Sequence, residues 1–373
     1  MSKFYRPTWV EIDLSTIQDN YRNIRNYVGE KSKIIAVVKA NAYGMGLVPT
    51  VKALHAEGCR NFAVATPDEA LELRDNDCLD SILLIGPATP SAAPMLIEYD
   101  IETVCGDDSF LNCLNDCARY YNKCAFVHFK IDTGMGRSGF LPEEFIEKIP
   151  AYSNMNNIKI SGILSHFAVA DEGPNEYTEL QYERFSKLLK SIGELGIDVG
   201  CRHICNSAAT VSYPHMHLDA VRVGKLLYGF WPDTNKPFQS KFPFKVRSEI
   251  TSIRKHNLGT SFGYGLRYAA RDNDLIAIAP IGYADGYSRM YFSKSFALVR
   301  GQRVPVVAGI CCDQIFLRVT EVPEVSIGDE VVLLGKQGDE EIRPEELGSY
   351  LGTSACEAFS LFRGRIPRVY LSR

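Results

Sequence analysis

Through its first two-thirds the chain alternates short apolar runs with amphipathic stretches, and this alternation restricts its fold more than any other feature. The apolar runs have the composition of strands buried on both faces, and the stretches between them have helical spacing. Strands that alternate with helices over about 200 residues are typical of a closed (β/α)8 barrel. A doubly wound open sheet shows the same alternation and stays an alternative at this point. The predicted strands cover residues 34–39, 61–65, 82–86, 101–105, 125–131, 158–166, 201–205 and 220–223.

After about residue 240 the pattern changes to short strands with no long helix between them, which is typical of a β domain. We therefore expect a barrel over residues 11–240, followed by a mainly β domain over residues 241–373. Residues 1–10 are candidates to pack on that second domain. The strands expected in it cover residues 246–254, 275–281, 296–300, 304–310, 315–319 and 330–334.

The composition of the chain excludes several classes of protein. Its 373 residues are 46% hydrophobic, and 41 Lys and Arg stand against 45 Asp and Glu, a formal net charge of −4. Proteins that bind nucleic acids usually carry a basic surface, so we expect no nucleic-acid partner. No apolar run reaches the roughly 18–20 residues that a membrane span requires, and the first residues lack the apolar stretch of a signal peptide. We expect a cytoplasmic protein that does not associate with membranes.

The cysteines indicate no metal centre. The chain has 11 of them, an odd number, and their spacing matches neither a secreted disulfide framework nor paired metal ligands. A zinc site needs several converging ligands, which this spacing does not supply. We expect most of the cysteines to be reduced and buried, and we expect no metal in the active site.

Polar residues stand at the ends of several predicted barrel strands. Catalytic groups of barrel enzymes gather at the carboxyl ends of the strands, because those ends meet at one mouth. A single lysine after an apolar run usually marks only the point at which the chain reaches the surface. Polar residues after several strands of one barrel instead predict a shared site. They are Lys39 after the first strand, Lys130 and Arg137 at the fifth, His166 at the sixth, Asn206 and Ser207 at the seventh, and Arg222 and Gly224 at the eighth.

A competing pattern lies in the same region. Residues 134–139 spell GxGxxG, which in a dinucleotide-binding fold joins a strand to a helix. Here the pattern follows the fifth predicted strand, the helix expected after it is short, and no acidic residue is well placed to bind a ribose. We therefore favour the barrel over a dinucleotide-binding fold.

Seven motifs resemble those of the alanine racemase family and occur in the same order as in that family. The resemblance extends over essentially the whole chain. It implies a barrel followed by a β domain, a pyridoxal 5'-phosphate cofactor, a small amino-acid substrate and a homodimer with shared active sites. The motifs are AVVKANAYG (36–44), DTGMGRSG (132–139), SHFA (165–168), NSAAT (206–210), GYG (263–265), PIGYADG (280–286) and RIPR (365–368).

The resemblance assigns the chemistry to two residues. Lys39 would bind the aldehyde of the cofactor and act as a base on one face of the substrate's α-carbon. Tyr264, which the β domain of one chain would supply to the other subunit, would act on the opposite face, because one group cannot serve both sides. A phenol with a pKa near 10 needs cationic neighbours to ionise near neutrality, and His166 and Arg137 are the candidates.

The remaining site residues also follow from the resemblance. Arg222 would face the ring nitrogen of the cofactor, and because a guanidinium stays charged it would donate a hydrogen bond without giving up a proton. His203 would orient this arginine. The resemblance implies further cofactor contacts for Tyr43, His166, Asn206, Ser207, Gly224 and Lys225, substrate contacts for Arg137, Tyr283, Cys312 and Asp313, and carbamylation for Lys130.

Three positions depart from the family pattern. Cys356 stands where the family usually has Tyr, Cys312 where it usually has Met, and Gly309 where it often has Arg. Loss of the tyrosine ring widens the inner gate of the site, and a pocket discriminates one small group by only about 1–3 kcal/mol. We expect alanine as the substrate, for peptidoglycan precursor supply, with a serine or broad-specificity racemase as the alternative. A basic amino-acid decarboxylase, which shares the two-domain architecture, is less favoured.

Overall fold

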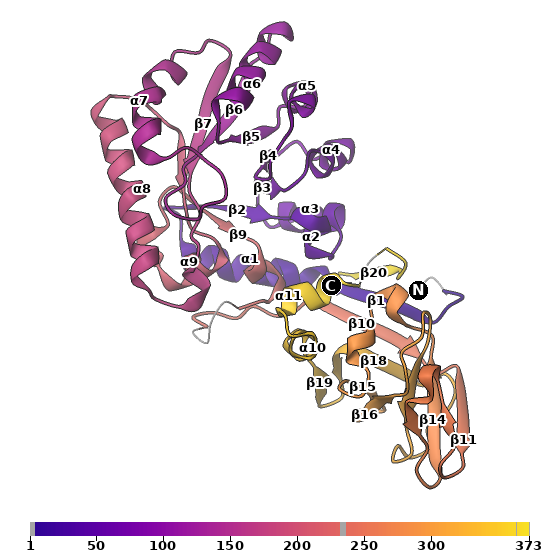
Figure 1. The fold of residues 1–373 in the computed structure, drawn as a ribbon. Helices are drawn as coiled ribbons and strands as arrows, with labels where there is room; N and C mark the ends of the chain where they lie inside the picture. The colour runs from indigo at the N-terminus through magenta and orange to yellow at the C-terminus, as the bar shows by residue number, and fades with distance from the viewer. Residues whose placement is uncertain (1–3, 232–235, 363, 373) are drawn as a thin grey trace. The chain divides into compact units, whose positions relative to one another are not determined.

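The structure is a computed structural model that describes residues 4–231, 236–362 and 364–372 (Figure 1). It divides into two compact units, one of residues 16–242 and one of residues 1–15 with 243–373. Residues 11–15, which we expected in the barrel domain, belong to the second unit because the strand β1 (Thr8–Asp13) is hydrogen-bonded in its sheet.

Eight strands of the described chain close into a parallel barrel, which confirms the predicted fold. The strands follow one another around the ring in chain order, and β2 closes the ring by pairing with β9. A closed ring excludes the open doubly wound sheet. The strands are β2 (Lys33–Val37), β3 (Asn61–Val64), β4 (Ser81–Leu84), β5 (Glu102–Cys105), β6 (Ala125–Lys130), β7 (Ile158–Leu164), β8 (Cys201–His203) and β9 (Ala220–Val223).

The core of the barrel combines an apolar cluster with buried polar side chains. Successive residues of a strand point to opposite faces, so alternate positions of neighbouring strands meet. Three buried polar residues, His128, His203 and Arg222, come from β6, β8 and β9. The apolar cluster consists of Ile35, Val37, Ala63, Leu83 and Ala220.

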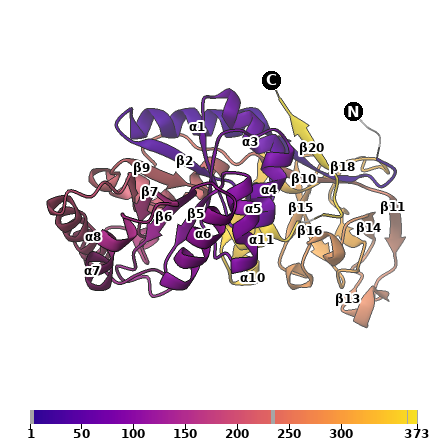
Figure 2. The ribbon, with the colours of Figure 1, turned by 90° about the horizontal axis from the view of Figure 1, so that it is seen from above.

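Helices surround the barrel strands (Figure 2). Polar side chains fix where several of them begin. In α4, for example, the Thr66 hydroxyl accepts a hydrogen bond from the backbone of Glu69, and the Glu69 carboxylate caps the backbone of Thr66 in return. The helices are α1 (Leu14–Val28), α3 (Leu47–Ala56), α4 (Pro67–Asp75), α5 (Ala93–Glu98), α6 (Asp108–Tyr120), α7 (Pro142–Tyr152), α8 (Glu176–Glu194) and α9 (Ser207–Ser212).

The second unit is built on one large sheet, in which β1 lies between β10 and β20. Figure 1 shows this indigo strand beside later strands of the chain. The sheet runs in the order β11, β14, β17, β16, β15, β18, β10, β1, β20, with β19 paired to β18. Its strands after β1 are β10 (Phe244–Glu249), β11 (Ser252–His256), β14 (Asp274–Ala279), β15 (Phe296–Val299), β16 (Gln302–Val307), β17 (Ile315–Arg318), β18 (Glu330–Gln337), β19 (Glu340–Ile342) and β20 (Arg368–Leu371). A separate pair, β12 (Ser261–Phe262) with β13 (Tyr268–Ala269), and the helices α10 (Pro344–Leu351) and α11 (Ala355–Ser360) complete the unit.

The predicted strand 246–254 is two strands, β10 and β11. The break falls where the backbone changes partners. The N–H of Ile250 donates to the carbonyl of Asp329 before β18, whereas the N–H of Thr251 donates to the carbonyl of Ile278 in β14. The apolar pattern of the sequence continues across this change, so it did not reveal the break.

Two expectations concern residues outside the site. The prediction that most cysteines are buried is wrong, because only Cys59, Cys105 and Cys205 are buried among the cysteines of the described residues. Burial raises the pKa of Cys59 to about 11 and that of Cys105 and Cys205 to about 12, which keeps them as thiols. Within the described ranges, none of the helices combines the length and the apolar character that crossing a membrane demands.

Candidate active site

Lys39 begins the short segment α2 (Lys39–Tyr43), directly after β2 at the carboxyl end of the barrel. The backbone of residues 40–43 is left-handed, with φ of 52° to 56°. This conformation costs each non-glycine residue about 1–2 kcal/mol. One anchor of the turn is Glu69, whose carboxylate accepts a hydrogen bond from the Asn41 N–H at 3.2 Å. The strained turn is therefore tied to the start of α4, and it fixes where Lys39 leaves the barrel.

The amine of Lys39 is a weaker base than an ordinary lysine amine. Burial lowers its pKa most, and the charges of Arg137 and Lys225 lower it further, while Glu69 acts in the opposite direction. None of the described residues accepts a hydrogen bond from this amine. Loss of the proton at lower pH makes the nitrogen available as a nucleophile.

Lys130 lies buried at the end of β6 and faces the loop that carries Arg137. Its amine donates a hydrogen bond to the Ser138 hydroxyl at 2.6 Å. Burial is the largest cause that lowers the pKa of Lys130, and the charge of Arg137 is the next. The loop is held by Asp132, whose carboxylate accepts the N–H groups of Gly134 and Gly136 at 2.9 and 3.1 Å. The GxGxxG pattern therefore forms a turn around a carboxylate, which is not a dinucleotide site.

His166, which follows β7, lies among the cations of the barrel mouth. Its Nδ1 is 3.0 Å from Nη2 of Arg222. Burial is the main cause that lowers the pKa of His166 to about 3, and the charge of Arg222 is the next. The charges of Arg137, Lys130 and Lys39 act in the same direction, so the barrel brings these four predicted residues around one histidine.

A neutral His166 corrects one expectation. His166 and Arg137 are the two candidates that the sequence offers for a cation that helps Tyr264 to ionise. With a pKa of about 3 the ring is uncharged at neutral pH, because burial and then the charge of Arg222 disfavour a positive charge on it. His166 is therefore the wrong candidate for this role, and Arg137 stays as the other candidate.

Arg222 is buried in β9, and most of its N–H groups donate hydrogen bonds to other residues of the barrel. Its Nη1 donates to Nδ1 of His203 at 2.7 Å, and its Nη2 donates to the carbonyls of Ser165 and Ile204 at 2.8 and 3.0 Å. Burial lowers the pKa of Arg222 to about 10, so the guanidinium stays charged at neutral pH. Among the described residues none accepts a hydrogen bond from its Nε–H, which leaves that donor for a ligand.

Small donors gather where α9 and the segment after β9 begin. The Gly224 N–H donates to the Ser207 hydroxyl at 2.9 Å. A Cβ on Gly224 would lie 2.6 Å from the Tyr43 hydroxyl, so only glycine lets the phenol approach. The Asn206 side chain caps α9, and Lys225 is exposed beside Gly224. These groups could bind an anion such as a phosphate.

Tyr264 belongs to the second unit, where its side chain is exposed at 72%. It starts a short turn between Gly263 and Gly265, whose φ values are 75° and 73°. A Cβ on Gly263 would lie 2.9 Å from the Cβ of Ala308. Gly309, which stands where the family often has Arg, is also closely packed, because a Cβ on it would lie 2.9 Å from the carbonyl oxygen of Tyr264. Because Gly263 and Gly309 have no Cβ, the turn that carries Tyr264 can pack closely against residues 308–309.

Among the other predicted residues of the second unit, Tyr283 interacts with both Cys312 and Tyr264. A hydrogen bond with Cys312 raises the pKa of Tyr283, and the charge of Tyr264 contributes. Asp313 accepts a hydrogen bond from Arg365 at 2.5 Å, which lowers the pKa of Asp313. This carboxylate is already paired with a cation. Cys356, half-buried in α11, is the remaining departure from the family pattern.

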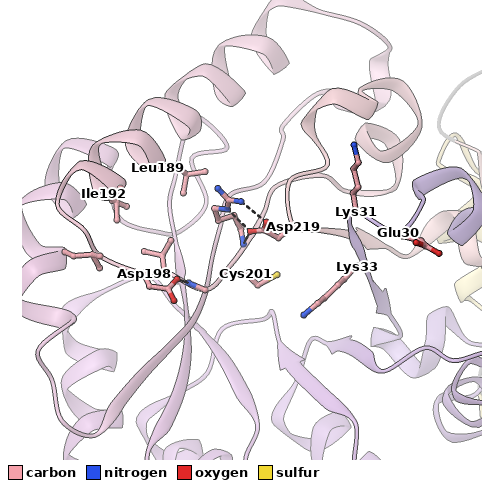
Figure 3. A pocket seen from close by; sticks show the side chains of 13 residues that line it. Glu30, Lys31, Lys33, Leu189, Ile192, Asp198, Cys201 and Asp219 are labelled. Atoms are coloured by element: carbon pink, nitrogen blue, oxygen red, sulfur yellow. Dashed lines mark hydrogen bonds and ion pairs between the residues drawn. The ribbon is translucent and has the colours of Figure 1, made fainter.

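A pocket of about 610 Å³ lies at the other end of the barrel (Figure 3). Its lining includes Lys33, Cys201 and Asp219, which stand at the amino ends of β2, β8 and β9. Lys39 and Arg222 do not line it. Barrel enzymes use the carboxyl ends of their strands, so this pocket is not the candidate active site.

Three residues with contacts to the site were not predicted from the sequence. Glu69 was detectable only as part of the capping pattern with Thr66, and that pattern does not reveal its bond to the turn after Lys39. His128 stands two positions before Lys130 and so points to the same side of β6, a signal that alternation offers. Glu102, the first residue of β5, carries no such signal.

Comparison with known proteins gives one family for both units. Residues 12–232 match the family described as alanine racemase, N-terminal domain, and residues 244–370 match alanine racemase, C-terminal domain. The alanine racemase of Halothermothrix orenii is 38% identical over 99% of this chain and 98% of its own length. The structure of alanine racemase from Clostridium difficile 630 has a TM-score of 0.95 at 35% identity, and covers 99% of this chain and 97% of that one. That of the Bacillus anthracis enzyme with bound L-Ala-P has a TM-score of 0.92 at 32% identity, over 99% and 96%.

Proposed function

This chain belongs to the alanine racemase family, and on that premise we propose that it interconverts L-alanine and D-alanine with pyridoxal 5'-phosphate as its cofactor. The observation that carries the proposal is the amine of Lys39. It stands at the mouth of the barrel, and burial and Arg137 lower its pKa. An amine that loses its proton readily can bind an aldehyde covalently.

The groups around Lys39 fit the other parts of this cofactor. The Ser207 hydroxyl and the Tyr43 phenol are donors suited to a phosphate, and the Gly224 N–H, which donates to the Ser207 oxygen, orients that hydroxyl. The spare Nε–H of Arg222 suits a ring nitrogen, to which it donates without giving up a proton. We assign cofactor binding to Lys39, Tyr43, His166, His203, Asn206, Ser207, Arg222, Gly224 and Lys225.

The proton transfers belong to two residues. When bound, pyridoxal phosphate withdraws electrons from the substrate and makes its α-proton acidic. The Nζ atom of Lys39 takes or returns this proton on one face of the α-carbon. The phenol oxygen of Tyr264 serves the other face, because inversion requires delivery on the side opposite to removal. In the reverse direction the two residues exchange roles.

Arg137 binds the substrate carboxylate in this proposal, and Lys130 supports it. Without modification, the protonated side chain of Lys130 repels Arg137, and this repulsion helps to lower the pKa of the lysine. Carbamylation would turn Lys130 from a cation into an anion and the repulsion into attraction. Tyr283, Cys312 and Asp313 complete the substrate side, with Asp313 held by Arg365.

We also propose that the protein is a cytoplasmic homodimer in which the second unit of each chain supplies Tyr264 to the barrel of the other. The support is that Lys39 and Tyr264 belong to different units, and that Tyr264 is 72% exposed in a single chain. Besides the cofactor and the second chain, the reaction needs only a small amino acid as its substrate. Its product, D-alanine, would serve peptidoglycan precursors.

The test is chiral chromatography of L-alanine after incubation with the cofactor-loaded protein, with L-serine in parallel. D-alanine should form much faster than D-serine, and Lys39→Ala should form neither. Borohydride reduction of the loaded protein should attach the cofactor to the peptide that contains Lys39. If no alanine is racemised, the proposal fails, and release of carbon dioxide from basic amino acids becomes the next assay.

Cys356 provides the test of substrate preference. If its small side chain widens the gate, Cys356→Tyr should lower turnover of serine relative to alanine by about tenfold, the scale of one small group in a pocket. Cys311→Ser, a change beside the site that adds no ring, is the matched control. An unchanged ratio in Cys356→Tyr would show that Cys356 does not set the preference.

A further inference from the structure

A chain of hydrogen bonds crosses the barrel core, starting at Arg222. Nη1 of Arg222 is 2.7 Å from Nδ1 of His203. Nε2 of His203 is 2.9 Å from Nδ1 of His128, and Nε2 of His128 is 2.7 Å from a carboxylate oxygen of Glu102. The other oxygen of Glu102 accepts a hydrogen bond from Ser81 at 2.6 Å. The chain thus connects the active-site end of the barrel with the amino ends of β4 and β5.

The two ends of this chain fix the position of every proton in it. Arg222 can only donate, so Nδ1 of His203 accepts and the proton of His203 is on Nε2. That proton makes Nδ1 of His128 an acceptor, so Nε2 of His128 carries the proton given to Glu102. Burial and Arg222 lower the pKa of His203 well below its ordinary value, in agreement with a single proton on that ring. All three hydrogen bonds therefore point from the guanidinium towards the carboxylate.

The sheet is shaped to let the two histidines meet. They belong to β6 and β8, with β7 between them. Opposite His128, β7 carries Gly162, and a Cβ there would lie 2.3 Å from Nδ1 of His128. The pairing of β6 with β7 also shifts register directly before His128, an irregularity that re-aims a side chain. Glycine leaves the space through which His128 reaches His203.

The carboxylate end of the chain faces other ionisable groups. Burial opposes ionisation of Glu102, but hydrogen bonds from His128 and Ser81 and the charge of Lys33 lower its pKa overall. Arg74 and Cys201 also lie close enough to interact with it. The side chain of Glu102 is 23% exposed, whereas both histidines are buried. A negative charge is therefore held at the far end of the chain from Arg222.

We propose that Glu102, acting through His128 and His203, is a positioning residue that orients the guanidinium of Arg222 at the barrel mouth. Without an anchored acceptor on His203, the guanidinium would lose one of the bonds that hold its plane. The spare Nε–H of Arg222 would then no longer be fixed in direction. The inference rests on the proposed function for its effect on catalysis, whereas the proton positions follow from the hydrogen bonds between Arg222, His203, His128 and Glu102 alone.

The direct test is nitrogen-15 NMR of the histidine rings in the cofactor-free protein, because protonated and unprotonated ring nitrogens have well-separated shifts. In the wild type, His203 and His128 should each be protonated on Nε2 alone. Glu102→Leu leaves the Nε2–H of His128 without an acceptor, so part of the population should carry this proton on Nδ1 and give up the hydrogen bonds from His203 and Arg222, which would appear as mixed protonation at both rings. Glu102→Gln keeps a carbonyl oxygen as acceptor and should restore the wild-type pattern. Gly162→Ala, which changes no polar group, should disturb His203 in the same way as Glu102→Leu.

Kinetics of the loaded enzyme provide the second readout. Glu102→Leu should lower kcat for alanine by about tenfold, the scale of one hydrogen bond to a charged group, with little change in KM. Glu102→Gln should recover most of the loss. Asp219→Asn is the matched control, since it removes a carboxylate at the same end of the barrel that pairs with Arg202 and does not touch the chain; its kcat should stay unchanged.

The outcomes separate the two proposals. Protonation of His203 on Nδ1 in the wild type, or a Glu102→Leu protein with unchanged ring shifts, would overturn the inference whether or not the protein is a racemase. A wild type with the expected shifts but no racemase activity would overturn the proposed function and leave the proton positions established. Should Glu102→Leu fail to fold, Glu102→Gln and Gly162→Ala still decide between ordered and mixed protonation.

Discussion

At the scale of single residues, the reactivity of Lys39 comes from its surroundings. Burial removes water from its ammonium form, and Arg137 and Lys225 repel the same charge. The residue is flanked by a buried strand on one side and a strained turn on the other, so the amine has a defined position as well as a lowered pKa. The sequence identifies the lysine, whereas the groups that lower its pKa are far from it in the chain.

Removal of Arg137 should therefore make Lys39 less reactive. Arg137→Ala takes away one of the charges that lower the pKa of Lys39, so the pKa should rise and the amine should stay protonated to higher pH. The measurement is the rate at which cofactor-free protein binds pyridoxal phosphate as a function of pH, and the profile should move to higher pH. Arg119→Ala, at an exposed arginine paired with Asp116, should leave the profile in place. Identical profiles for wild type and Arg137→Ala would show that Arg137 does not act on Lys39.

The neutral ring of His166 has a consequence for acid stability. Its pKa is about 3 in the folded chain and near 6.5 in an unfolded one, so between these values the unfolded state binds the extra proton. The contribution of the neutral His166 to the unfolding free energy is fully present above pH 6.5 and is lost as the pH falls towards 3. From pH 7 to pH 5 it should cost about 2 kcal/mol of unfolding free energy.

His166→Gln keeps an acceptor for Arg222 but does not titrate, and it should lose correspondingly less stability on acidification. Urea titrations at pH 7 and pH 5 measure the difference. His215→Gln, at an exposed histidine, is the matched control and should behave as the wild type does. Equal acid sensitivity of His166→Gln and wild type would contradict a neutral His166.

At the scale of elements, the left-handed turn after β2 is the least ordinary piece of the barrel. Four consecutive residues, none of them glycine, have positive φ. Ala40 is one of the four and is exposed, so a substitution there can relieve backbone strain without disturbing the core. Ala40→Gly should raise the unfolding free energy by about 1 kcal/mol, because glycine has no Cβ to strain. The measurement is urea denaturation of the cofactor-free protein. Ala151→Gly, at an exposed alanine of the right-handed helix α7, should lower stability instead.

The elements also show what a sequence can and cannot reveal. The eight barrel strands are predictable because strands buried on both faces are continuously apolar, a local property. The division between β10 and β11 is not, because it depends on which distant strand each backbone group bonds. The same holds for the site. Lys39, His166 and Arg222 end apolar runs and can be found, but the link from Glu102 through His128 to His203 runs across strands that are far apart in sequence.

At the scale of the whole molecule, the proposed shared active site can be tested by mixing inactive chains. Lys39→Ala and Tyr264→Phe should each be inactive alone. If each site takes Lys39 from one chain and Tyr264 from the other, a mixed dimer has one intact site and one doubly altered site. Random re-association of equal amounts should restore about one quarter of wild-type activity, since half of the dimers are mixed and half of their sites are intact.

Racemase assays after unfolding and refolding the two variants together measure this recovery. Each variant refolded by itself is the control for reversion and should stay inactive. A mixture with no activity would place Lys39 and Tyr264 of one chain in the same site and contradict the exchange of units. Wild type refolded in the same way sets the full scale of the assay.

The place of β1 in the sheet of the second unit has a consequence for biosynthesis. This strand pairs with β10 and β20, so residues 8–13 are bonded to residues 244–248 and 368–371. On the ribosome, the barrel residues 16–242 emerge complete and can fold while the chain is still growing. The strand made before them must wait, unpaired, until segments made long after it appear. The sheet of the second unit therefore becomes complete only after residues 368–371 have been made, and the early strand is the part of the nascent chain that most needs protection from aggregation.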